Sequence, residues 1–350
     1  MTGAGTWLRT LEERARAELP TPVFQHLVHG ARESVTAEEA NAAWSAVRFH
    51  PHVLRDVTEI DLAVTLLGER FEVPWGVAPT TLQRAVHPDG EVAMATACAA
   101  AGSLLVVSSN AGSTFGEIAA TGVGWWLQAY LPADRTLALP LLERAVAAGA
   151  SAVVLTVDTP VVGTKYVDGV GIWDTVEPHR VRVNFDPGYD DQPGSEKALD
   201  LGPHDVDWLA TVTGLPVVVK GVLRPDDARR CAQAGARAIW VSNHGGRQLD
   251  RSARTADCLP GVVAAVGGQA EVYVDGGVRD GLDVLAATAL GAQAVFLGRL
   301  PLYALLDGEP GVRRMHEELS LQTREAMRLA GCRTVPDTLG IVAPAGPTPL

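Results

Sequence analysis

Short hydrophobic runs alternate with helix-forming stretches along most of the chain. Most runs are nearly continuous in apolar, often β-branched residues, as is typical of parallel strands that are buried on both faces. The eight runs are Trp75–Ala78, Leu104–Val107, Trp125–Tyr130, Ala152–Val157, Pro216–Lys220, Ala238–Asn243, Glu271–Gly276 and Ala294–Gly298. Because helical stretches separate the runs, the pattern predicts an α/β protein with a (β/α)8 (TIM) barrel.

The stretches between the runs carry helix formers, and several close with glycine just before the next run. Glycine at that place fits a left-handed helix C-cap. The clearest examples are Gly90–Ala101, Leu137–Gly149, Pro225–Gly235 and Gly281–Gly291. A doubly wound open sheet is the alternative architecture, but the count of eight and the lack of a GxGxxG motif after the first run disfavour it.

Two segments depart from the repeat. Residues 1–74 form an N-terminal extension in which Glu12–Leu19 and Ala37–Val47 predict helices packed outside the barrel. Residues 158–207 form a long connection after the fourth run, and its middle is rich in Asp, Gly, Pro and Ser. Loops of this length are commonly functional, and this one leaves the barrel face that carries active sites. We therefore expect one domain over residues 1–350, with residues 158–207 as an active-site loop.

Composition and charge narrow the class of protein. The chain is 47% hydrophobic and 20% charged, which is enough to bury a large core. Its formal charge of −12 disfavours binding to nucleic acid or to an anionic membrane. No apolar run approaches the roughly 20 residues of a membrane span, and no signal-peptide core is found at the start. We expect a soluble, cytoplasmic protein.

The four cysteines are scattered and include no CxxC pair. This spacing makes a disulfide framework or a metal site improbable, so we expect structural thiols and no bound metal. The cysteines are Cys98, Cys231, Cys258 and Cys332.

Polar residues stand at the carboxyl end of every predicted strand. In a barrel these ends converge on one cavity, so eight such ends together predict a functional site. After the seventh and eighth runs, Asp275–Arg279 and Leu297–Arg299 combine glycines with an arginine side chain. Glycines let backbone N–H groups approach an anion closely, and guanidinium groups bind phosphate oxygens. These two ends therefore predict a phosphate site.

Five segments together resemble the FMN-dependent α-hydroxy acid oxidase/dehydrogenase family, which includes glycolate oxidase, lactate oxidase and mandelate dehydrogenase. The segments are Leu127–Tyr130 (LQAY), Leu155–Pro160 (LTVDTP), Val219–Val222 (VKGV), Val241–Asp250 (VSNHGGRQLD) and Val274–Ala292. The resemblance implies a (β/α)8 barrel that binds FMN and oxidises a small-molecule 2-hydroxy acid to a 2-oxo acid. It also implies electron transfer to O2 or another acceptor, and a homo-oligomer, commonly a tetramer.

The resemblance implies catalytic roles for four residues and a substrate-binding role for a fifth. His244 would be the base that removes a substrate proton, from either the α-carbon or the hydroxyl, because imidazole accepts protons near neutral pH. Asp158 would contact His244 and stabilise the imidazolium. Lys220 would stabilise the anionic reduced flavin. Tyr130 would direct its hydroxyl at the substrate, and Arg247 would bind the substrate carboxylate through its planar fork.

The same comparison implies a set of cofactor-binding residues along the strand ends. Those that would face the flavin ring are Ala78, Pro79, Thr80, Ser108, Gln128, Thr156, Lys220 and Ser242. Those that would hold the ribityl phosphate are Asp275, Gly277, Arg279, Gly298 and Arg299.

Two substrate positions depart from the family pattern. Lys165 stands where a second arginine is expected after TVDTP, and His26 stands where a tyrosine is expected. Lysine keeps the charge of arginine but loses its fork. Gly30–Val53 is similar to a family branch that oxidises a modified peptide in mycofactocin maturation. An FMN-dependent oxidation of a bulkier or amine-bearing biosynthetic substrate is therefore the alternative function.

Two other classes of protein are considered. A flavin-binding protein without turnover is disfavoured because both His244 and Asp158 are present. A nucleotide dehydrogenase with a catalytic cysteine is disfavoured because none of the cysteines lies at the carboxyl end of a predicted strand.

Overall fold

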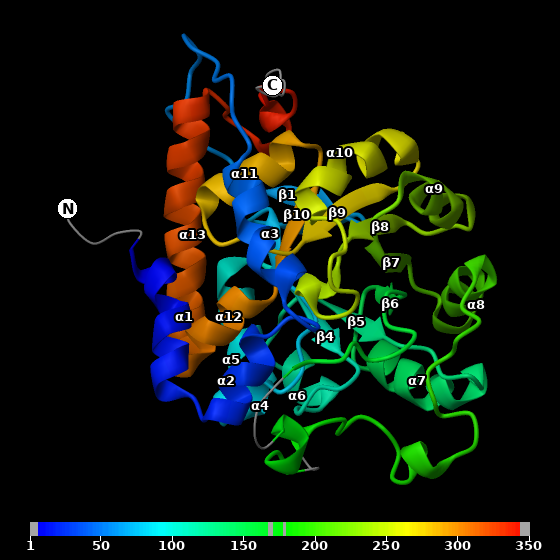
Figure 1. Cartoon of the computed structure of the whole chain (residues 1–350). Coiled ribbons are helices and arrows are strands. Elements are labelled where there is room, and N and C mark those ends of the chain that lie inside the picture. Colours follow the sequence, from blue (N-terminus) through cyan, green and yellow to red (C-terminus); the bar gives the residue numbers. More distant parts are fainter. Residues whose placement is uncertain (1–5, 167–170, 178–179, 344–350) are drawn as a thin grey trace.

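The computed structural model describes residues 6–166, 171–177 and 180–343, and in it eight parallel strands close into a barrel (Figure 1). Each strand falls within or next to a predicted run, and pairing of Val295 with Trp75 joins the last strand to the first. The predicted barrel is therefore confirmed. Its strands are β3 (Trp75–Val77), β4 (Leu104–Ser108), β5 (Trp125–Ala129), β6 (Val153–Thr156), β7 (Val217–Val222), β8 (Ala238–Val241), β9 (Glu271–Asp275) and β10 (Ala294–Leu297).

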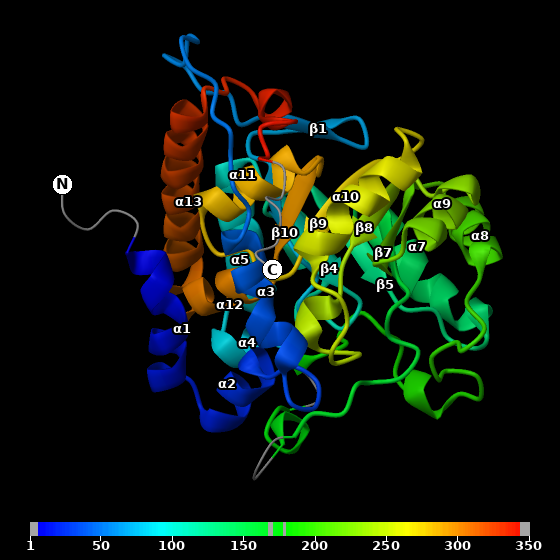
Figure 2. The same ribbon diagram turned by 45° about the horizontal axis from the view of Figure 1, so that its top comes forward.

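Helices surround the barrel, and the four predicted between strands are found within about two residues of their expected ends. The long C-terminal helix α13 runs beside α5 along one side of the barrel (Figures 1 and 2). The helices of the barrel are α4 (Gln83–Val86), α5 (Gly90–Ala101), α6 (Phe115–Ala119), α7 (Leu139–Ala147), α8 (Pro203–Thr213), α9 (Pro225–Gln233), α10 (Thr255–Val266), α11 (Gly281–Ala289), α12 (Arg299–Ala304) and α13 (Gly308–Ala330). None of the helices among the described residues has the length and apolarity needed to cross a bilayer.

Aromatic side chains fill the interior of the barrel. Trp126, Trp240, Tyr273 and Phe296 are each at most 1% exposed, and the rings of Trp240 and Phe296 stack with centroids 3.9 Å apart. A barrel filled in this way is a packed core rather than a pore. Room for a ligand is therefore confined to its carboxyl end.

A hairpin that the sequence pattern did not predict packs on the same interior cluster. It consists of β1 (Val64–Leu66) and β2 (Glu69–Phe71), and Leu66 and Phe71 join the aromatic core. Its turn residues Leu67 and Gly68 both have positive φ, as a type I′ hairpin turn requires. Strands of three residues are too short to show a reliable alternation, which explains why the pattern missed them.

The N-terminal extension packs against the barrel as expected, with α1 (Trp7–Glu18), α2 (Thr21–Val28) and α3 (Val35–Ser45). The indole nitrogen of Trp44 donates to the carbonyl of Gly276 at 2.6 Å. Gly277 has φ +85°, and a β-carbon there would lie 2.4 Å from the carbonyl oxygen of Ala40. The close approach that glycine permits therefore holds α3 against the loop after β9.

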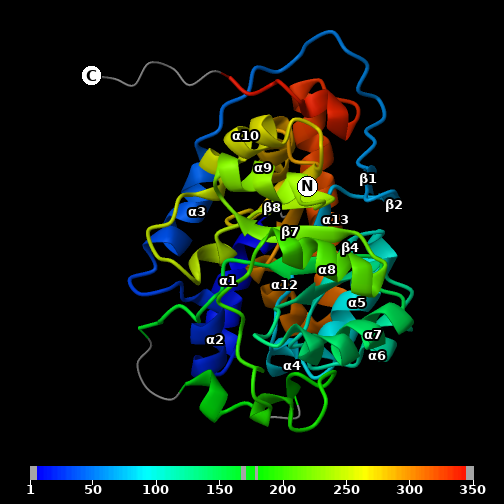
Figure 3. The same ribbon diagram turned by 90° about the vertical axis from the view of Figure 1, so that its right-hand side faces the viewer.

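The long connection after β6 ends earlier than predicted, because α8 begins at Pro203 rather than after Asp207. Proline at the first helical turn and a hydrogen bond from the Gly202 amide to the Asp205 carboxylate, at 2.8 Å, start the helix there. The described part of the connection contains only short 3-10 turns, including Ile172–Asp174 and Tyr189–Asp191. It lies on the same side of the molecule as α2 and α4 (Figures 1 and 3).

Candidate active site

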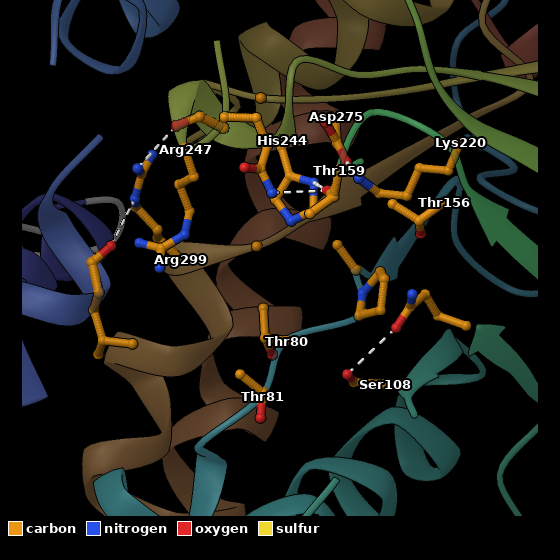
Figure 4. Close-up of a pocket in the computed structure, with 18 of the residues that line it drawn as sticks. Thr80, Thr81, Ser108, Thr156, Thr159, Lys220, His244, Arg247, Asp275 and Arg299 are labelled. Atoms are coloured by element: carbon orange, nitrogen blue, oxygen red, sulfur yellow. Dashed lines mark hydrogen bonds and ion pairs between the residues drawn. The ribbon is translucent and has the colours of Figure 1, made fainter. Parts of the chain in front are cut away.

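A cavity of about 300 Å³ lies at the carboxyl end of the barrel. In Figure 4, His244 and Lys220 lie on one side of it and Thr80 and Ser108 on the other. Most of the residues that the sequence predicted for the site line this cavity. They are His26, Ala78, Pro79, Thr80, Ser108, Gln128, Tyr130, Thr156, Lys165, Lys220, His244, Arg247, Asp275, Gly277, Arg279, Gly298 and Arg299.

The other two predicted residues, Asp158 and Ser242, lie behind the cavity wall and contact residues that line it. Asp158 contacts the ring of His244. Ser242 is fully buried, and its hydroxyl accepts hydrogen bonds from the Lys220 ammonium at 2.8 Å and from the His244 amide at 3.1 Å. Asp158 therefore affects the cavity through His244, and Ser242 affects it through Lys220 and His244.

His244 and Asp158 form a partly buried pair, with 2.9 Å between Nδ1 and Oδ1. Burial opposes ionisation of Asp158, but His244 and Lys220 outweigh it and hold the pKa of this carboxyl below its usual value. Burial also lowers the pKa of His244, although Asp158 opposes that change. The pair is thus an ionised carboxylate and a neutral imidazole. Since a carboxylate only accepts, Nδ1 carries the proton and Nε2 can accept one.

A short hydrogen-bond chain supports this pair. Thr159 Oγ1 donates to Asp158 Oδ1 at 3.1 Å and accepts from Gln248 Nε2 at 2.7 Å. Gln248 Oε1 in turn accepts from the amide of Gly163 at 2.8 Å. The loops after β6 and β8 are therefore tied together around the histidine. Sequence analysis did not single out Gln248, although it lies within the VSNHGGRQLD segment.

Lys220 is a fixed positive charge in the cavity wall. Its side chain is only 4% exposed, and its ammonium lies 3.1 Å from Asp275 Oδ2 (Figure 4). The bond to Ser242 fixes the ammonium from a second direction. Because the ion pair is buried and its geometry is set by two partners, the charge needs no reorganisation when a ligand enters.

Arg247 joins the barrel to the N-terminal extension and lies beside Arg299 (Figure 4). Its guanidinium donates to the backbone carbonyls of His26 and His29, and one further N–H lies 3.2 Å from His26 Nε2. Burial, followed by the charges of Arg247 and Lys165, lowers the pKa of His26 to about 3, so this ring is neutral and accepts. Three of the five guanidinium donors are thereby used, which leaves two for a ligand.

Lys165 lies at the cavity, but its ammonium is turned to the backbone. It donates to the carbonyl of Gly163 at 2.8 Å and to that of Arg247 at 3.0 Å. Burial and then the charges of Arg247 and Lys197 lower its pKa to about 8. Lys165 therefore stabilises the loop that carries Arg247. Its ammonium is directed at the backbone, whereas the guanidinium of the expected family arginine would be directed at the substrate.

Arg279 and Arg299 are neighbouring cations in the lining of the cavity. Arg299 donates to the carbonyls of Leu27 and Gly245, each at 2.9 Å, and Arg279 donates to the carbonyl of Val278 at 3.1 Å. Neither guanidinium pairs with a carboxylate within the described ranges. Burial and the neighbouring Arg279 lower the pKa of Arg299, which shows that the two charges repel. Two adjacent cations that make no direct ion pair within the described ranges fit a bound phosphate.

Three buried polar atoms at the cavity test whether FMN fits. Gln128 Nε2, Thr156 Oγ1 and Asp275 Oδ1 have no hydrogen-bond partner among the described residues, although all three residues line the cavity. Buried polar groups without partners are costly, and the carbonyl and imide groups of a flavin ring, together with the hydroxyls of its ribityl chain, would satisfy them. With Lys220 beside them and the arginine pair at the other end, the residues fit FMN.

Several other residues line the cavity that sequence analysis did not assign to the site. Trp173, on the connection after β6, has its ring 5.9 Å from that of His26 in an edge contact. The ammonium of Lys197, on the same connection, lies 4.0 Å from the centre of the Tyr130 ring. No strand-end motif marks either residue, because long-range packing brings the connection to the cavity. In the part of the chain that the structure describes, no cluster of side chains is arranged to hold a metal ion.

Comparisons with known proteins agree with this geometry. A family described as FMN-dependent dehydrogenase matches residues 15–339. "Glycolate oxidase 3" of Arabidopsis thaliana is 39% identical over 93% of this chain and 92% of its own length. "2-Hydroxyacid oxidase 1" of Homo sapiens is 40% identical over 93% and 92%.

A solved structure of mandelate oxidase with (S)-4-hydroxymandelic acid superposes with a TM-score of 0.87 at 37% identity. The match covers 95% of this chain and 96% of that chain. The resemblance inferred from the motifs is thus confirmed. The chain belongs to the FMN-dependent α-hydroxy acid oxidase/dehydrogenase family of oxidoreductases, and its cofactor is FMN.

Proposed function

We propose that this protein oxidises a 2-hydroxy acid to a 2-oxo acid, with His244 as the base. The observation that carries the proposal is the contact between His244 Nδ1 and Asp158 Oδ1, 2.9 Å apart, at a cavity that Lys220 and Arg247 also line. A neutral ring with a free nitrogen can take a substrate proton. The glycolate, 2-hydroxy acid and mandelate oxidase names of the relatives support a substrate of this class.

FMN supplies the acceptor for the two electrons that leave the hydroxyl-bearing carbon. The side chains supply binding and proton transfer. The two free donors of Arg247 bind the substrate carboxylate. Nε2 of His244 takes a substrate proton, and Asp158 stabilises the imidazolium that results. The fixed ammonium of Lys220 stabilises negative charge that develops beside it.

Three further expectations belong to this proposal. The relatives are named oxidases, which favours O2 as the electron acceptor, and peroxide formation would measure this. A homo-oligomer and a cytoplasmic location remain predictions from sequence; light scattering on the purified protein tests the first. The alternative of a bulkier or amine-bearing substrate gains no support from relatives whose names refer to hydroxy acids.

A panel of 2-hydroxy acids, mixed anaerobically with the FMN-loaded protein, tests the proposal. We expect at least one member to bleach the visible absorbance of the oxidised flavin within seconds of mixing in a stopped-flow experiment. The corresponding 2-amino acids serve as the matched control set. Bleaching by amino acids alone, or by no member of either set, would overturn the proposed substrate class.

A further inference from the structure

All three lysines of the chain line the active-site cavity. The chain has 29 Lys and Arg residues, of which only Lys165, Lys197 and Lys220 are lysines, and each of the three lines the cavity. Fewer than a tenth of the chain's residues line it, so chance would seldom gather every lysine there. Arginine supplies the positive charges elsewhere. The ammonium groups therefore indicate that this cavity needs compact point charges.

Two of these lysines have structural partners, and the third has none for its ammonium. Lys220 is held by Ser242 and Asp275, and Lys165 is held by two backbone carbonyls. Within the described ranges, the ammonium of Lys197 makes no hydrogen bond and no ion pair. The ammonium instead lies over the face of the Tyr130 ring, 4.0 Å from the ring centroid. Three N–H donors are thus available to a ligand.

The backbone fixes Lys197 at this place. Residue 197 forms an isolated antiparallel bridge with Pro132, in the segment after β5. The amide of Ala133 donates to the carbonyl of Glu196 at 2.8 Å, and the amide of Ala198 donates to that of Leu131 at 2.9 Å. Ala198 is only 2% exposed. The half-buried lysine therefore lies on an anchored part of the long connection.

The charges at the substrate end of the cavity do not balance. Burial lowers the pKa of Lys197, with Asp158 opposing, and the charge of Lys197 contributes to the lowered pKa of Lys165. Arg247 also lowers the pKa of Lys165, so Lys165 lies within interaction range of both other cations. Asp158 acts on Lys197 and supplies one negative charge, and the neutral His244 adds none, so two of the three positive charges stay uncompensated. One substrate carboxylate would leave this cluster with excess positive charge.

We propose that Lys197 binds a second acidic group of the substrate, so that the substrate is a 2-hydroxy acid with a carboxylate or phosphate at its other end. The inference rests on the proposed function and narrows its substrate class. Arg247 takes the carboxylate beside the hydroxyl, and the ammonium above Tyr130 takes the second anion. An ammonium suits this task because it accommodates either anion without a fixed fork.

Ligand binding tests the proposal without requiring turnover. Each ligand is titrated into the FMN-loaded protein, and its dissociation constant is read from the perturbed visible spectrum of the flavin. The carboxylate pair is 2-oxoglutarate and 2-oxopentanoate; the phosphate pair is 3-phosphoglycerate and glycerate, titrated anaerobically at equilibrium. In at least one pair, we expect the member with the second acidic group to bind at least about tenfold more tightly than its partner. The pair that shows this preference identifies the second anion as a carboxylate or a phosphate.

Substitutions in the connection after β6 test whether Lys197 causes this preference for the second acidic group. K197M is expected to abolish it, K197R to retain at least part of it, and E196Q, on the exposed neighbour, to leave it unchanged. Equal affinities within both pairs would overturn the proposal, and so would a preference that survives in K197M. Equal weakening of both members of a pair in K197M would also overturn it, because Lys197 would then bind the carboxylate beside the hydroxyl. Flavin bleaching by 2-hydroxy acids tests the proposed function separately.

Discussion

Replacing Asp158 by asparagine removes the charge that stabilises a protonated His244. The paired atoms are 2.9 Å apart, and because the charges of carboxylate and imidazolium are delocalised, their effective separation is about 4 Å. At an effective dielectric constant of about 20, their attraction is about 4 kcal/mol. Asparagine keeps the shape of the side chain and loses this attraction. We therefore expect D158N to reduce its flavin about 10²- to 10³-fold more slowly than the wild type.

The pH profile of D158N supplies a second readout. His244 must be neutral to accept a proton, so activity is lost as the pH falls through its pKa. Burial lowers that pKa and Asp158 opposes the change; removing Asp158 therefore moves the acid limb to lower pH while the plateau falls. Stopped-flow reduction of the flavin measures both effects, with D191N, on an exposed aspartate of the same connection, as control. A plateau at the wild-type level, or an acid limb at higher pH, would refute the reasoning.

Three further predictions concern cofactor binding and stability. R299Q removes one of two neighbouring cations at the predicted phosphate site, so FMN should bind at least about tenfold more weakly, measured by the fluorescence of released flavin. G277A would force a β-carbon to within 2.4 Å of the Ala40 carbonyl at a φ of +85°, and should cost roughly 2–4 kcal/mol in urea unfolding; G116A, in open space on α6, is its control. Buried His316 accepts from Trp75, and burial lowers its pKa from 6.5 to about 4. Its neutral form is favoured in the folded state, so its contribution is complete above pH 6.5 and declines, by up to about 3 kcal/mol, as the pH falls to 4. H316Q should lose less stability than the wild type over that range.

The barrel could be predicted from sequence because its parallel strands are buried on both faces and leave continuous apolar runs. The hairpin β1–β2 and helix α2 could not, since three-residue strands and an eight-residue helix carry too little periodicity. The family motifs located the pair of His244 and Asp158, whose Nδ1–Oδ1 contact the structure then supplied.

The substrate end of the cavity was less accessible to prediction from sequence. Lys165 and His26 could be recognised as departures from the family pattern, but the direction of the Lys165 ammonium depends on carbonyls that only the folded chain brings near. Lys197 lies outside every motif and reaches the cavity through the bridge to Pro132, 65 positions earlier in the chain. The scarcity of lysine was the one sequence feature that could have indicated it.

The most direct test of the account is the anaerobic flavin-reduction rate of H244Q in a single turnover. His204, exposed on α8, provides the matched control H204Q. The account predicts that H244Q retains FMN but reduces it at least about 10²-fold more slowly than the wild type, and that H204Q does not differ from the wild type. Reduction by FMN-loaded H244Q at the wild-type rate would contradict the assignment of His244 as the base.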